Sequence, residues 1–332
     1  LALHQPVALR QGCLRSLGSG NRAPAQALTR RVAARILRPM TTHSLARELR
    51  DKRVGLVLSA GYFGFFGHAG FLAALEGAGI EPVAYAGTSA GALVASLAAC
   101  GMDAQQVAQL LQRVRRQDFW DPAPLTAVFE AARGRGFTGL LAGLRFRRLL
   151  DAALPVERIE ETKKKLVIVT TDITAAAPRI HTEGPLAEVV HASCAYPGLF
   201  RAVPFSRAQL WDGGLVDKAP LRALAEHAQV DALLVHYLPG AARRVTEGPP
   251  TDRWHGYVQA MARSLLAVRH ENFELQARLC EARGLPVYVV SPQLPRLSPR
   301  RLAQGRDVIA TATAAGAKAL AAPASESRVF AR

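Results

Sequence analysis

The chain has 332 residues, of which 49% are hydrophobic and only 6% aromatic. This composition excludes a wholly disordered, collagen-like or coiled-coil protein. Lys and Arg number 42 against 26 Asp and Glu, and the resulting net charge of +16 directs attention to nucleic acid or an anionic membrane as partner.

Much of this charge lies at one end, since residues 1–39 contain seven arginines and no acidic residue. The composition of this stretch resembles a targeting peptide, and the alternatives are a mis-assigned start or a disordered tail. An apolar run typical of a secretory signal is missing, and no run approaches the roughly 18 apolar residues of a membrane-spanning helix. We therefore expect a cytoplasmic or peripheral-membrane protein.

From residue 41 onward the pattern alternates between helix and strand. Thr41 and Thr42 are expected to cap a short helix over residues 44–53. The elements that follow are a strand, a Gly-rich loop, a helix, a strand and a helix, over residues 54–58, 59–67, 68–78, 83–86 and 89–100. Such alternation predicts an α/β fold with three layers, in which helices cover both faces of a mainly parallel central sheet.

The remainder of the chain continues this plan. Further buried strands are predicted at residues 166–170, 209–211, 232–237 and 287–290. Residues 103–154 have helical spacing interrupted by proline and glycine, which indicates a helical insertion over the sheet. An exposed loop is expected at residues 243–253, and helices at 252–283 and 299–320. Four widely separated cysteines favour neither a zinc site nor a disulfide framework, and no cofactor or metal is expected.

The strongest local motif is the G-x-S-x-G sequence of residues 87–91. It follows a predicted strand and precedes a predicted helix, which is the context that gives this motif its meaning. Gly87 and Gly91 permit the tight turn, and the turn lifts the Ser89 hydroxyl above the edge of the sheet. The pattern therefore predicts a nucleophilic serine at the positive end of a helix, and the alternative is an ordinary strand–helix turn.

A serine nucleophile needs a base, and Asp212 is the candidate that stands out. It follows a short apolar run and precedes Gly213 and Gly214, which permit a sharp exit of the chain. A histidine base of an α/β-hydrolase triad is the rival interpretation. The histidine candidates are His181, His191, His227, His236, His255 and His270.

The Gly- and aromatic-rich segment 59–70 could aim several backbone N–H groups at a developing oxyanion. Dinucleotide or phosphate binding is a weaker alternative, because the glycine spacing does not match G-x-G-x-x-G and no G-K-[ST] is present. The aromatic residues of the segment suit either an acyl channel or plain core.

Taken together, these motifs resemble the patatin-like phospholipase family of Ser–Asp lipid acyl hydrolases. The resemblance covers about half of the chain and includes residues 54–58, the G-x-S-x-G, residues 167–172, residues 193–200 and the D-G-G. It implies that Ser89 is the nucleophile, Asp212 the general base, and the N–H groups of Gly61, Tyr62 and Ala90 the oxyanion hole. It also implies a catalytic domain over residues 54–240, and we expect residues 241–332 to pack on it as a helix and strand extension.

The sequence departs from the family pattern at two places. The usual loop is a triple glycine followed by Arg or Lys and Gly, whereas Gly64 occupies the basic position here and Tyr62 one of the glycine positions. After the D-G-G, the usual Asn-x-Pro is replaced by residues 218–220, Lys-Ala-Pro. A divergent subfamily is therefore expected.

The resemblance implies a serine hydrolase that cleaves carboxyl esters of phospholipid or another acyl lipid. The alternatives are a non-catalytic lipid- or protein-binding relative and a triad esterase. The basic runs of the body lack a nucleic-acid recognition module. If the insertion at 125–154 is amphipathic, its arginines suit peripheral contact with an anionic lipid surface.

Overall fold

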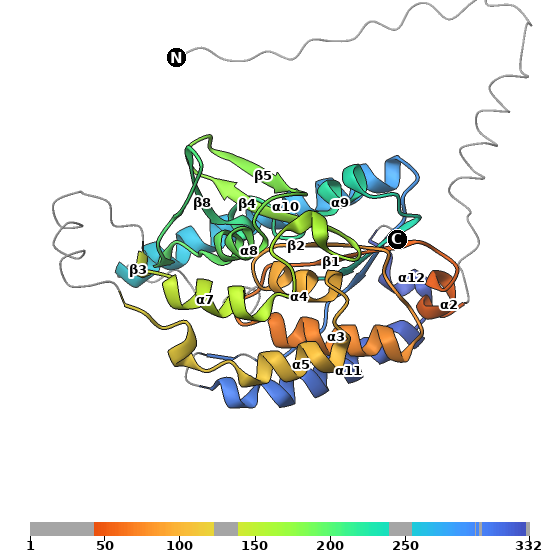
Figure 1. Ribbon diagram of the computed structural model, residues 1–332. Helices are drawn as coiled ribbons and strands as arrows, with labels where there is room; N and C mark the ends of the chain where they lie inside the picture. The colour runs from red at the N-terminus through yellow and green to blue at the C-terminus, as the bar shows by residue number, and fades with distance from the viewer. Residues whose placement is uncertain (1–42, 123–138, 239–253, 296, 299–300, 330–332) are drawn as a thin grey trace, which may run out of the picture. The chain divides into compact units, whose positions relative to one another are not determined.

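The computed structural model describes residues 43–122, 139–238, 254–295, 297–298 and 301–329 (Figure 1). The predictions for residues 1–39, for the caps Thr41 and Thr42 and for the loop 243–253 lie outside these residues. So does the middle of the expected insertion, residues 123–138.

An eight-stranded sheet forms the centre of the described chain. Five neighbouring strands run parallel, in the order β10 (Val287–Val290), β9 (Ala232–His236), β1 (Val54–Leu58), β2 (Ala84–Gly87) and β4 (Lys165–Asp172). Antiparallel strands complete this end of the sheet, namely β5 (Ala177–His181), β8 (Ala208–Asp212) and β7 (Val203–Phe205). The predicted mainly parallel sheet is therefore confirmed.

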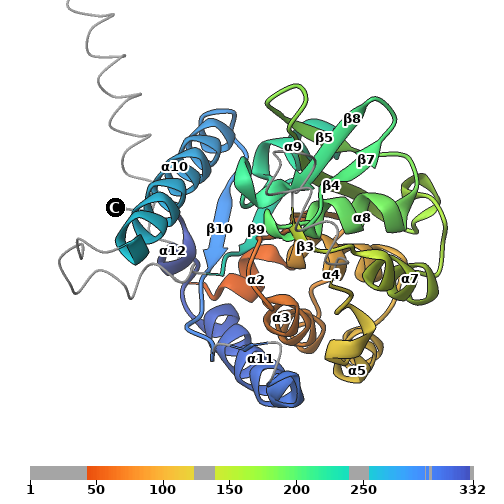
Figure 2. The same ribbon diagram turned by 90° about the vertical axis from the view of Figure 1, so that its left-hand side faces the viewer.

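Helices cover both faces of the sheet because its strands are apolar on both sides. Leu56 and Leu58 of β1 join the core beneath one helical layer, whereas Val57 between them joins the core on the opposite face. The first layer is seen below the sheet in Figure 2 and consists of α3 (Phe65–Gly77), α4 (Ala90–Ala99), α5 (Ala104–Arg113), α8 (Leu186–Cys194) and α11 (Gly305–Ala321). The second consists of α9 (Leu221–His227) and α10 (Trp254–Ala282).

Smaller elements complete the molecule around these layers. They are α2 (Leu45–Leu49), α7 (Leu144–Ala153) and α12 (Ala324–Ser327), and a two-stranded parallel sheet of β3 (Gly139–Leu141) and β6 (Gly198–Phe200). In the described part of the chain no helix is long and apolar enough to cross a membrane, and no group of three or more metal-ligating side chains occurs.

Several predicted boundaries were wrong. The first helix ends at Leu49 and is capped by the Ser44 side chain, which accepts a hydrogen bond from the Arg47 amide at 3.3 Å. Helix α3 begins at Phe65, so the loop before it ends at Gly64 and is shorter than predicted. The helix expected over 299–320 begins at Gly305. Strands β3, β5, β6 and β7 were not predicted, because they are short and only partly buried.

Candidate active site

Ser89 lies on the sharp turn between β2 and α4, with a backbone φ of +56°. This left-handed conformation is costly for a residue with a side chain, and it occurs at functional turns that expose one residue. The glycines on either side are required by close packing. A Cβ atom on Gly87 would lie 2.4 Å from the carbonyl oxygen of Gly91, and a Cβ on Gly91 would lie 2.0 Å from that of Leu58.

Asp212 is the last residue of β8, and only 4% of it is exposed. Its main chain is fixed to β4 by the hydroxyl of Thr171, which donates to the Asp212 carbonyl at 2.8 Å. The following turn brings the amide of Gly214 to 2.7 Å from the Asp212 carboxylate. A Cβ on Gly213 would lie 2.0 Å from the Val169 carbonyl oxygen, so only glycine fits between this turn and β4.

Ser89 lies close enough to Asp212 for its side chain to lower the pKa of the Asp212 carboxyl group. Burial is the largest influence and raises this pKa to about 6, whereas Ser89, the hydrogen bond from the Gly214 amide and the charge of Arg269 oppose the rise. A carboxyl group with this pKa is ionised at neutral pH and still basic enough to take up a proton.

The loop between β1 and α3 lies beside the Asp212 turn. The amide of Ala60 donates to the carbonyl of Lys218 at 2.7 Å, and the amide of Gly64 donates to the carbonyl of Gly61 at 2.9 Å. A Cβ on Gly64, the position that is basic in the family pattern, would lie 2.3 Å from the end of the Leu238 side chain, so an apolar side chain packs against this position.

Three backbone amides around this loop and the serine turn are unengaged. The N–H groups of Gly61, Tyr62 and Ala90 donate no hydrogen bond to any described residue. Ala90 begins α4, whose positive end therefore lies next to Ser89. Free amides in these positions are suited to binding an oxyanion.

A buried pair of histidines, His68 and His236, packs against the start of this loop. His68 of α3 contacts the carbonyl oxygen of Ser59 at 2.8 Å and the Nδ1 atom of His236 at 2.8 Å. Phe71 stacks on His236, with ring centroids 4.3 Å apart. Burial lowers the pKa of His68 to about 4 and that of His236 well below its usual value, so both rings are neutral at pH 7.

The C-terminal end of α8 contacts the serine turn, which the sequence alone did not indicate. The Ser193 hydroxyl accepts a hydrogen bond from the Ser89 amide at 2.9 Å and donates to the Val169 carbonyl at 2.8 Å. Burial raises the pKa of the neighbouring Cys194 thiol, and the Ser89 side chain opposes this rise. Ser193 thus fixes the backbone of Ser89, and Cys194 lies near its side chain. The only sequence signal was the segment 193–200, which carried no assigned role.

The histidine candidates of the triad interpretation have partners elsewhere. His181 contacts the Thr170 hydroxyl, His227 contacts the Ala223 carbonyl, and His270 pairs with Glu274. His236 belongs to the pair with His68, and His191 packs against Phe146. The side chain of His255 lies outside the described residues.

Comparison with known proteins gives a consistent result. The family model described as patatin-like phospholipase matches residues 56–225. Patatin-like phospholipase domain-containing protein 6 of Mus musculus is 32% identical over 180 residues, which is 53% of this chain but 13% of that protein. Lysophospholipase NTE1 of Yarrowia lipolytica is 31% identical over 179 residues, or 53% of this chain and 12% of that protein. Among solved structures, VipD from Legionella pneumophila is similar with a TM-score of 0.41 and 15% identity, over 83% of this chain and 67% of that chain.

Proposed function

Because the chain belongs to the patatin-like phospholipase family, we propose that it hydrolyses carboxyl esters of phospholipids or related acyl lipids through Ser89 and Asp212. Membership indicates lipid hydrolase chemistry at the level of the family. The observation that supports the specific proposal is that Ser89 lies on a strained turn, with a φ of +56°, next to the buried carboxyl group of Asp212, whose pKa it lowers.

In the first half of the reaction, Asp212 accepts the Ser89 proton while the serine oxygen attacks the ester carbonyl. The negative charge that develops on the carbonyl oxygen is bound by the N–H groups of Gly61, Tyr62 and Ala90. Collapse of the tetrahedral intermediate breaks the ester bond, and the proton held by Asp212 passes to the departing alcohol. The acyl group remains on Ser89.

In the second half, Asp212 takes a proton from a water molecule, which attacks the acyl-enzyme. Collapse of the second intermediate returns the proton to Ser89 and releases the fatty acid. Asp212 is the carboxyl group next to Ser89, and in this proposal it takes the role that histidine has in a triad.

The site is also suited to a lipid surface. Four exposed apolar side chains, Tyr62, Leu140, Leu144 and Tyr196, occur in the loops and short elements around the serine. A series of contacts connects the segments that carry them. Phe63, next to Tyr62, packs on Phe119, and the nearby Asp121 accepts a hydrogen bond from the amide of Gly143, next to Leu144. Strand β3, which contains Leu140, pairs with β6, which begins two residues after Tyr196. Exposed Arg148 on α7 adds positive charge. We expect this rim to contact anionic membranes peripherally.

The experiment for the dyad uses the purified protein with a lysophospholipid, and fatty-acid release is measured. Ser89→Ala and Asp212→Asn are each expected to lower kcat at least about a thousandfold. The matched control is Ser96→Ala, a buried serine of α4 that bonds the Ala92 carbonyl; it should stay within about threefold. Retained hydrolysis in folded Ser89→Ala would contradict the dyad, and a folded wild type that hydrolyses no acyl ester would favour the non-catalytic alternative.

The lipid contact is tested separately by sedimentation with anionic vesicles. Leu140→Ser and Leu144→Ser should weaken vesicle binding together, because each removes an exposed apolar side chain from the rim. Leu275→Ser is the matched control on α10, since Leu275 is as exposed as Leu140, at 53% and 54%. Equal loss of binding in all three variants would exclude a specific role for the rim.

A further inference from the structure

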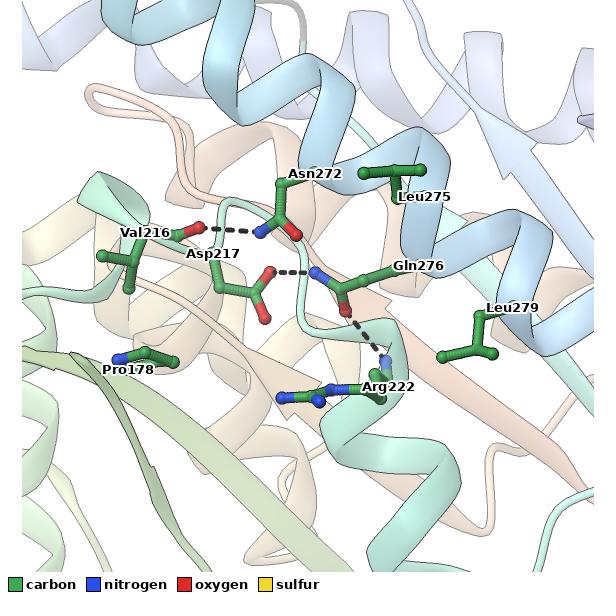
Figure 3. Close-up of a pocket in the computed structure, with 8 residues that line it drawn as sticks. All are labelled: Pro178, Val216, Asp217, Arg222, Asn272, Leu275, Gln276 and Leu279. Carbon is green, nitrogen blue, oxygen red and sulfur yellow. Dashed lines mark hydrogen bonds between the residues drawn. The ribbon is translucent and has the colours of Figure 1, made fainter.

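One face of α10 is directed at the turn that carries Asp212. Figure 3 shows Asn272 and Gln276 pointing from this helix toward the residues that follow the D-G-G motif. Asn272 donates to the carbonyl of Val216 at 2.8 Å, and Gln276 donates to the carboxylate of Asp217 at 3.0 Å. These two hydrogen bonds fix α10 against the turn. A hollow of about 400 Å³ at this place is lined by residues of α10 and of the turn together with Pro178 and Arg222.

Arg269 lies on the same face of α10, three residues before Asn272 and seven before Gln276. Its charge reaches the active site, since it lowers the pKa of Asp212 and of Lys218. The Nε and Nη2 atoms of Arg269 are buried and have no hydrogen-bond partner among the described residues. A buried guanidinium group without acceptors is unfavourable, and native proteins usually supply them with a partner.

Lys218 is a second buried cation at the same place. Its ammonium group donates to the Leu238 carbonyl at 2.6 Å and lies 4.0 Å from the centre of the Tyr237 ring. Burial and the charge of Arg269 lower its pKa to about 8, so it is mostly protonated at pH 7. The carbonyl of the same residue holds the amide of Ala60 and thereby the loop that carries Gly61 and Tyr62.

Two cations and two carboxyl groups lie at this place among the described residues. Arg269 and Lys218 are the cations, and Asp212 is the carboxyl group whose pKa the charge of Arg269 lowers. Asp217, the other acidic residue of the turn, has its carboxylate bonded to Gln276 and to the Ala219 amide. An anion that enters beside Ser89 would supply the acceptors that the Nε and Nη2 atoms of Arg269 lack among the described residues.

We propose that Arg269 and Lys218 form a subsite for anionic oxygen atoms of the bound lipid, namely the phosphate of a phospholipid whose ester is presented to Ser89. This proposal rests on the proposed function for its substrate class. Arg269 is the specificity-determining residue, because its planar guanidinium group offers parallel donors that match a phosphate. Lys218 adds charge from the side of the oxyanion loop.

The test measures binding rather than turnover, so that it does not depend on Ser89 chemistry. Calorimetry at pH 7 compares decanoyl lysophosphatidylcholine with monodecanoylglycerol, which has the same acyl chain and no phosphate, on the Ser89→Ala protein. We expect the phosphate-bearing lipid to bind at least about tenfold more tightly. Arg269→Met should remove this difference, and Arg269→Lys should retain part of it because the charge remains.

The matched control is Arg278→Met, which removes the same charge from an exposed position of α10; it should keep the preference. Equal binding of the two lipids to Ser89→Ala, or an undiminished preference in Arg269→Met, overturns the subsite. A further arm compares decanoic acid with decanol. An Arg269-dependent preference for the acid alone would assign the subsite to the carboxylate of the released product instead of the phosphate.

The two proposals fail separately. Hydrolysis that persists in Ser89→Ala overturns the catalytic dyad but leaves an Arg269-dependent phosphate preference in place. Loss of hydrolysis in Ser89→Ala together with equal binding of the two lipids supports the dyad and overturns the subsite.

Discussion

Replacement of Asp212 by asparagine should stabilise the protein at the pH at which the dyad works. The carboxyl group is almost fully buried, and burial raises its pKa from 3.8 to about 6. A group whose pKa is higher in the folded state contributes its full stability below pH 3.8, and this contribution is lost as the pH rises through 6. A shift of about two units corresponds to about 3 kcal/mol of unfolding free energy.

At pH 8 the wild-type protein therefore carries an ionised Asp212 that destabilises the fold by about this amount. An asparagine side chain at this position would be neutral at every pH, and its oxygen can still accept the hydrogen bond from Gly214. We expect Asp212→Asn to be inactive and more stable by about 2–3 kcal/mol at pH 8, with the gain falling to about half at pH 5.

Urea unfolding at pH 8, 7, 6 and 5, followed by circular dichroism, measures this difference. Asp231→Asn is the control of opposite sign, because the neighbouring Arg53 lowers the pKa of this exposed carboxyl to about 2. Ionised Asp231 stabilises the fold above the unfolded pKa, so its replacement should destabilise the protein at pH 8. An Asp212→Asn protein no more stable than wild type at pH 8 would refute the inference that burial raises this pKa.

Three other changes have definite expected results. Ser193→Ala should lower kcat about tenfold with little effect on the melting temperature, since the Ser89 amide loses its acceptor; an unchanged kcat would show that Ser193 does not position the nucleophile. Gly91→Ala should abolish activity and destabilise the fold in urea, because the new Cβ would meet the Leu58 carbonyl, whereas Gly77→Ala meets nothing within 4 Å and should be tolerated. Finally, the stability of the wild type should fall as the pH drops from 6.5 toward 4, because buried neutral histidines must take up protons on unfolding, at about 1.4 kcal/mol per pH unit for each fully engaged proton. A urea midpoint independent of pH between 7 and 5 would contradict this assignment. The histidines whose pKa burial lowers to about 4 are His68, His181 and His191.

Local sequence predicted the central strands well because their cause is local. Strands β1 and β10 were located to the residue, since each is a short apolar run between turns and is buried on both faces. Strands at the edge lack this signal. The sequence of β5 is Ala-Pro-Arg-Ile-His and that of β7 contains Pro204, and only their partners β4 and β8 establish them as strands.

The start of α3 illustrates a long-range cause. Gly64 and Gly67 suggested a loop that ends at residue 67, yet Gly67 lies within the helix, as does Gly70. A Cβ on Gly70 would lie 2.3 Å from the Ile309 carbonyl oxygen of α11, and the Thr313 hydroxyl donates to the Gly70 carbonyl at 3.1 Å. These glycines allow two helices to approach closely, and the contact joins segments that are more than two hundred residues apart in the sequence.

Some residues of the candidate site could be identified from a local motif, and others only from the tertiary structure. Ser89 and Asp212 were identified because each sits in a glycine-flanked motif of a few residues. Arg269 carried no such signal, because nothing in the sequence distinguishes it from the other residues among the 42 Lys and Arg of this chain. It is distinguished in the structure, where its Nε and Nη2 atoms are buried and have no hydrogen-bond partner among the described residues. The high net charge pointed to an anionic partner, and the structure adds an arginine, Arg269, whose Nε and Nη2 atoms are buried without a hydrogen-bond partner among the described residues and whose charge lowers the pKa of Asp212.

Despite the departures from the family pattern, the position of the oxyanion loop is held by a main-chain hydrogen bond. The loop is joined to the Asp212 turn through the amide of Ala60 and the carbonyl of Lys218, and a main-chain bond of this kind survives a change of either side chain. A Cβ on Gly64 would meet the end of the Leu238 side chain, which would have to shift, and the carbonyl of Leu238 binds the ammonium group of Lys218. Lys218, which follows the D-G-G, is a buried cation whose main chain is bonded to this loop, and the charge of Arg269 lowers its pKa.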